Sequence, residues 1–157
     1  MRIFKFAAYL LVIVFIQTVF LARLNLWGAI PDLVLTSIII YAVLNEIEST
    51  AVFAFAAAFM QEALSIGPYI GMLTKLLSAV FINIFKDSFM DDKYLASFYF
   101  VAAFTPLTLI AEAIVLFYFY GRPIFLLPLL GTVISSTVLN TLTVFILYPV
   151  INKLNNG

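Results

Sequence analysis

Long, unbroken runs of apolar residues constrain this chain more than any other feature of its sequence. The chain has 157 residues, of which 65% are hydrophobic and 10% charged, whereas soluble domains are about 45–50% apolar and about 25% charged. Within a bilayer only helices and closed barrels satisfy every backbone polar group, and the runs lack the period of two that strands would show. The sequence therefore predicts an all-α integral membrane protein, with residues 1–157 as a single transmembrane helical domain.

Short polar breaks between the runs predict a compact bundle of about six transmembrane helices. We expect them at about 4–22, 31–45, 50–64, 70–85, 95–120 and 127–149. The second helix is short for a hydrocarbon core about 30 Å thick, so it either crosses a thinned bilayer or re-enters on one side. Six spans place both termini on one face. Five lysines and arginines on that face against two on the other predict that it is cytoplasmic.

The residue types that are missing exclude several function classes. There is no cysteine and no histidine, which excludes disulfides, Cys/His metal sites and imidazole catalysis. The net charge is zero and no basic face for nucleic acid is evident. Asp87, Asp91 and Asp92 fit a solvated loop better than a metal site. We expect no enzyme activity, no cofactor and no nucleic-acid partner.

Three charges lie deep in apolar sequence: Glu62, Lys75 and Glu112. A charge at mid-membrane depth costs about 2.5–3.5 kcal/mol on insertion scales, so such residues are rarely present without a role. We expect Lys75 to pair with Glu62 or Glu112. The charges could fix the helix register, line a polar pocket for a ligand, or contact a partner's transmembrane helix.

Two features suggest how the early helices begin and pack. Pro31 suits a first helical turn, and Asp32 suits the positive end of a helix dipole, so Asp32 is expected to cap the second helix. Ala54 and Ala58 are four residues apart on the third helix, a spacing that allows close approach of another helix. We expect these residues to serve helix packing or a partner interface.

The later polar and small residues predict a turn and an inward face. Gly67 and Gly71 have small-xxx-small spacing, but Pro68 lies between them, so a turn is expected there. Thr132, Ser136 and Asn140 recur every four residues and share one helix face, which we expect to point into the bundle.

Several of these motifs together resemble the MreD family of bacterial rod shape-determining proteins. The resemblance covers residues 28–85, and its motifs are Pro31-Asp32-Leu33-Val34-Leu35, Glu62-Ala63-Leu64-Ser65, Gly67-Pro68 and Ile70-Gly71. It implies a non-enzymatic protein of the bacterial cytoplasmic membrane that binds an MreC-like single-span protein. The larger assembly would be the cell-wall elongation complex, with an MreB-type filament, a RodA-type polymerase and a penicillin-binding protein.

The same resemblance implies a fold similar to the substrate-binding subunits of energy-coupling-factor vitamin transporters, which supplies a second hypothesis. A transporter subunit would have a small-molecule pocket lined by Glu62, Lys75, Glu112 and Asn140. Such subunits often dock through an Ala-x-x-x-Ala face on helix one, but here the residue four positions after Ala7 is Leu11 and the residue four positions after Ala8 is Val12. A scaffold would instead dock a partner span through small and polar helix faces, with the loop 86–94 toward the inner components.

Overall fold

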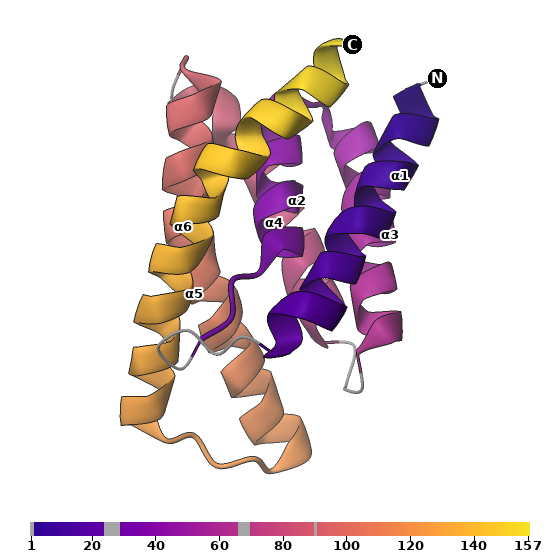
Figure 1. Ribbon diagram of the computed structural model, residues 1–157. Helices are drawn as coiled ribbons and strands as arrows, with labels where there is room; N and C mark the ends of the chain where they lie inside the picture. The colour runs from indigo at the N-terminus through magenta and orange to yellow at the C-terminus, as the bar shows by residue number, and fades with distance from the viewer. Residues whose placement is uncertain (1, 24–28, 66–69, 90) are drawn as a thin grey trace.

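The computed structural model describes residues 2–23, 29–65, 70–89 and 91–157, and these residues form six α-helices (Figure 1). The helices are α1 (Arg2–Phe15), α2 (Leu33–Leu44), α3 (Ile47–Leu64), α4 (Ile70–Phe89), α5 (Lys93–Tyr120) and α6 (Leu126–Asn156). A π-helical turn (Ile16–Phe20) and a 3-10 turn (Leu21–Arg23) extend α1. All six predicted helices are therefore present.

Helix α2 is the centre of the bundle. Ten consecutive residues of α2, from Val34 to Val43, are buried, and the helix packs against α1, α3, α4, α5 and α6. A helix that is apolar on every side is surrounded either by protein or by lipid, and here the other helices surround it. At 12 residues, or about 18 Å, α2 is as short as predicted. Its length need not match the bilayer, because protein rather than lipid covers it.

The segment before α2 carries the chain into the bundle interior. Ala29 and Pro31 are buried, and Figure 1 shows this segment rising between the helices before α2 begins. Non-helical backbone is tolerated at membrane depth only where protein or a water-filled cavity surrounds it. The start of α2 therefore depends on polar partners from neighbouring helices.

Four helical stretches are long and apolar enough to cross a membrane: Phe4–Arg23, Ile47–Leu64, Lys93–Tyr120 and Leu126–Asn156. Large apolar side chains cover their outer surfaces, including Val52, Ile134 and Ile146, which are 72%, 64% and 69% exposed. Such surfaces suggest a membrane protein. Helix α4 has a similar length but carries Lys75, Lys86 and Asp87.

The two ends of the chain lie at the same end of the bundle (Figure 1), where Lys5 Nζ donates a hydrogen bond to the Gly157 carbonyl at 3.2 Å. The α5–α6 connection lies at the opposite end. The predicted end of the last helix at residue 149 is wrong, because α6 continues past Pro149 to Asn156. Proline removes one backbone donor, but Leu147 and Ile151 stay in the core on either side of it.

Candidate functional site

A buried ion pair joins α4 to the residue that begins α2. Lys75 is 4% exposed, and its Nζ lies 3.1 Å from Asp32 Oδ2. The same nitrogen donates a hydrogen bond to Gln61 Oε1 on α3 at 2.7 Å. One cation therefore holds three helices around the start of α2.

The predicted ion-pair partner of Lys75 is wrong. The predicted role of Asp32 as the cap of α2 is confirmed, but it is not the only role of this residue. Within the described part of the chain, Lys75 pairs with Asp32 and not with Glu62 or Glu112. Asp32 also caps α2, because its Oδ1 accepts a hydrogen bond from the Leu35 amide at 2.9 Å. One carboxylate oxygen serves the cap and the other serves the lysine. Both roles are possible because the entering segment places Asp32 inside the bundle.

Glu62 and Glu112 approach the same point on α4, the backbone of Gly71. Glu112 Oε1 accepts a hydrogen bond from the Thr74 hydroxyl at 2.9 Å. A Cβ atom at Gly71 would clash with Glu62 Oε1 and would lie 3.4 Å from Glu112 Oε1. Glycine therefore leaves the space that the two carboxylates occupy.

These charges line one pocket of about 300 Å³, which we call the charged pocket. Its lining contains the three acids, two basic side chains and an amide, namely Asp32, Glu62, Glu112, Lys75, Arg122 and Gln61. All three deep charges predicted from the sequence thus meet at one site. Among the described residues, no group of acids is arranged to hold a metal ion.

Behind this pocket, two amide side chains satisfy the first backbone donors of α2. Asn140 Oδ1 accepts a hydrogen bond from the Asp32 amide at 2.6 Å, and Gln17 Oε1 accepts one from the Leu33 amide at 2.8 Å. Asn140 Nδ2 in turn donates to Thr105 Oγ1 at 3.2 Å. Asn140 is 1% exposed and Ser136, one turn earlier, is 5% exposed, so the inward face predicted for α6 is confirmed. Asn140 does not line the pocket itself.

The other predicted packing residues have different outcomes. Ala54 and Ala58 are fully buried in the chain's own core, so they pack helices together and do not face a partner. Pro31 is buried next to the start of α2. Gly67 and Pro68 lie outside the described residues.

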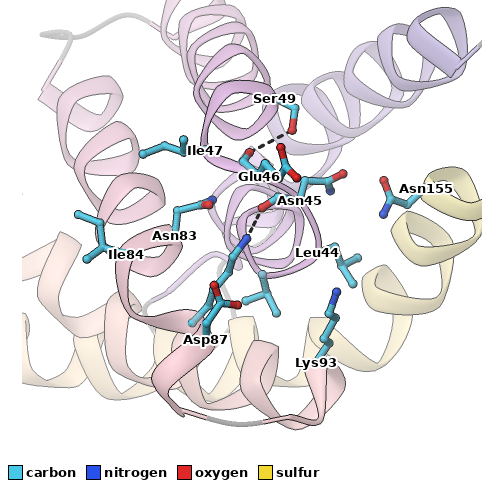
Figure 2. A pocket seen from close by; sticks show the side chains of 12 residues that line it. Leu44, Asn45, Glu46, Ile47, Ser49, Asn83, Ile84, Asp87, Lys93 and Asn155 are labelled. Carbon is cyan, nitrogen blue, oxygen red and sulfur yellow. Dashed lines mark hydrogen bonds between the residues drawn. The ribbon is translucent and has the colours of Figure 1, made fainter.

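A second polar region lies at the other end of α2, where the sequence predicted only a solvated loop (Figure 2). Lys86 Nζ donates hydrogen bonds to the carbonyls of Ala42, at 3.2 Å, and Asn45. Asn83 Nδ2 donates to the Ala42 carbonyl at 3.1 Å and to Thr50 Oγ1 at 2.9 Å. We call the hollow beside these groups, of about 910 Å³, the polar hollow.

The sequence analysis missed two residues of the charged pocket, Gln61 and Arg122, and also Thr74, which donates a hydrogen bond to Glu112 beside it. Two of the three are next to a charge that the sequence analysis singled out, since Gln61 precedes Glu62 and Thr74 precedes Lys75. A polar residue beside a charge in an apolar helix is a usable signal, because both must find partners within the bundle.

The chain was compared with protein-family models, with curated proteins and with solved structures. None of the three comparisons finds a match.

Proposed function

We propose that this protein is a non-enzymatic membrane scaffold that resembles MreD and binds an MreC-like single-span protein in the bacterial cell-wall elongation complex. One observation carries the proposal. The residues that carry the resemblance, Asp32, Glu62 and Gly71, come from three helices and meet around Lys75 in one pocket. Convergence of distant motif residues supports a shared site, because a chance match of short apolar motifs gives no reason for them to meet.

The hydrogen bonds of the interior polar groups also support a scaffold function, because they join helices to one another. Lys75 joins α2, α3 and α4, while Glu112 joins α5 to α4 through Thr74. Asn140 joins α6 to α2 and α5. These bonds fix the helices relative to one another, so the outer surface keeps one shape for a partner to recognise.

In this proposal the helices form a six-helix membrane bundle with both termini on the cytoplasmic face of the bacterial inner membrane. The α5–α6 connection then lies on the outer face. We also propose that the fold of this bundle is similar to that of the substrate-binding subunits of energy-coupling-factor transporters.

The partner's span would dock in the groove between α4 and α5. This groove, of about 380 Å³, has small and hydroxyl side chains (Ser78, Thr108 and Ala111) between the apolar rims of Leu77 and Leu107. Small residues and hydroxyls let transmembrane helices approach closely and form hydrogen bonds. Leu77 and Leu107 are exposed and Ala111 is half-buried, so a partner can reach them, whereas Ser78 and Thr108 are buried.

Gentle extraction followed by native mass spectrometry tests the scaffold proposal. The tagged protein should carry a single-span protein with a large extracytoplasmic domain. Ala111→Trp fills the groove and should reduce the amount of this partner about tenfold or more. Ile134→Trp, on the exposed face of α6, is the matched control and should leave partner binding unchanged. Equal recovery of the partner with both variants would exclude the α4–α5 groove, and absence of any such partner would overturn the scaffold itself.

The transporter hypothesis has one observation in its favour, the charged pocket itself. Its volume of about 300 Å³ is at the lower end of the range for small-molecule sites. Its lining contains Glu62, Lys75 and Glu112 but not Asn140. A bound species of a few hundred daltons that survives purification of the wild type, and is lost in Lys75→Met, would favour this function over the scaffold.

A further inference from the structure

The polar hollow does not end at the bundle surface but continues into an apolar groove. This groove, which we call the α1–α3 groove, has a volume of about 600 Å³, and Asn45 and Ser49 line both it and the polar hollow. The rings of Tyr41 and Phe53 stack in its wall, with centroids 4.1 Å apart, and Phe6 meets them edge-on. The apolar groove and the polar hollow are therefore next to each other and share part of one wall.

The length of the groove matches one leaflet of a bilayer. Its α3 wall runs from Glu48 to Ala56, which is about 12 Å of helix. A hydrocarbon core about 30 Å thick gives each leaflet about 15 Å. A partner's spanning helix would need a groove about twice as long, whereas an acyl chain of one leaflet fits.

The polar hollow is neutral but rich in charge. It contains two acids, Glu46 and Asp87, and two lysines, Lys86 and Lys93. Lys86 is engaged with the α2 carbonyls. The side chains of Glu46 and Lys93 form no hydrogen bond or ion pair with any described residue, and both line the hollow in Figure 2. A head group with one phosphate and one ammonium complements this mixture, whereas a purely anionic head group would meet the two acids unfavourably.

We propose that the α1–α3 groove and the polar hollow together hold one zwitterionic phospholipid of the leaflet nearest the chain termini. The acyl chain lies against Tyr41 and Phe53, the lysines face the phosphate, and the carboxylates face the ammonium. This site shares no residue with the proposed partner groove, although both include residues of α4 and α5, and it does not depend on the scaffold function.

Lipid retention from discs of defined composition tests the proposal. The wild-type protein is reconstituted in nanodiscs with equal amounts of phosphatidylethanolamine and phosphatidylglycerol, extracted gently and weighed by native mass spectrometry. We expect one retained phosphatidylethanolamine, with a preference of about fivefold over phosphatidylglycerol, since each charge near a head group is worth about 1 kcal/mol. Equal retention of both lipids, or retention of neither, would overturn the proposal.

Two variants locate the lipid and keep the test independent of the partner. Ala56→Trp fills the groove and should abolish retention, whereas Ala111→Trp, in the α4–α5 groove, should retain the lipid like the wild type. Glu46→Lys should reverse the preference toward phosphatidylglycerol, a result that mere loss of structure cannot produce. If Ala56→Trp retains the lipid and Glu46→Lys keeps the original preference, the site is not the one proposed.

Discussion

Both ends of α2 have backbone groups without a partner inside the helix, and side chains of opposite chemistry satisfy them. At its start, the free backbone amides meet acceptors, which are Asp32, Asn140 and Gln17. At its end, the free carbonyls meet donors, which are Lys86 and Asn83. Each choice also suits the helix dipole, with a carboxylate at the positive end and an ammonium at the negative end.

The surroundings of the two ends differ more than their chemistry. Lys75 at the start of α2 is 4% exposed, whereas Lys86 at the end faces the polar hollow. A buried charge that loses its partner has no water to replace it, whereas water can reach the carbonyl of Asn45, which is only partly buried. Similar hydrogen bonds should therefore have different energetic weight, and substitutions at the two ends measure that difference.

Removing the buried lysine should have the largest effect. Lys75→Met leaves Asp32, Glu62 and Glu112 without the cation that lies among them, which should reduce the free energy of unfolding by about 3–5 kcal/mol. Equilibrium unfolding in mixed detergent micelles measures this loss. The double variant Lys75→Met/Asp32→Asn keeps an oxygen for the α2 cap and should recover part of the stability. If Lys75→Met reduces the free energy of unfolding no more than Lys86→Met does, the proposed difference between the two ends of α2 is wrong.

Removing the amide acceptor behind the pocket should have the next largest effect. In Asn140→Leu the buried Asp32 amide loses its acceptor, which costs about 1–3 kcal/mol. The matched substitution at the other end, Asn83→Leu, leaves Lys86 on the Ala42 carbonyl and should cost less. Unfolding of both variants under one set of conditions gives the ranking, and a larger loss for Asn83→Leu would contradict the proposed difference between the ends.

Much of the fold is readable from the sequence, because lipid leaves a chain few options. The apolar runs predicted the six helices, and proline followed by an acid predicted where α2 begins. Hydropathy could not show that the other helices enclose α2. It compares the length of each apolar run with the thickness of a bilayer, and an enclosed helix does not need to match that thickness. The even spread of apolar residues around α2 gave no signal either, because a span surrounded by lipid has the same pattern.

The charged pocket was predicted in its members but not in its pairing. Glu62, Lys75 and Glu112 stand out because charges are rare in apolar sequence. Asp32 did not stand out as their partner, because its neighbours in the sequence suggest a loop at the membrane surface. Its depth comes from the fold, through the buried Ala29 and Pro31 that carry it inward. Pairing depends on depth, and depth is not encoded in local sequence.

A smaller effect is expected from the lysine at the open end of α2. Lys86→Met removes a donor to the Ala42 and Asn45 carbonyls, but Asn83 still donates to the Ala42 carbonyl, and water in the polar hollow can reach the Asn45 carbonyl. The expected loss of unfolding free energy is about 0.3–1 kcal/mol, the usual contribution of a cation at a helix C-terminus. Raising the salt concentration should shrink the difference between this variant and the wild type. A salt-independent loss above about 3 kcal/mol would place Lys86 in the same class as a buried charge.

The smallest effect is expected at Gly71, where two contributions oppose each other. Replacing a glycine in the middle of a helix by alanine gains about 0.5–1 kcal/mol, which is an upper bound for Gly71 in the first described turn of α4. The new methyl group would clash with Glu62 Oε1, yet Glu62 is only partly buried and its flexible side chain can move away. Gly71→Ala should therefore change the unfolding free energy by less than about 1 kcal/mol. In a Glu62→Ala background the clash is absent, so the same substitution should show the full helix gain. If the gain is equal in both backgrounds, the space at Gly71 is not reserved for the Glu62 carboxylate, and Gly71 has no special role in the charged pocket.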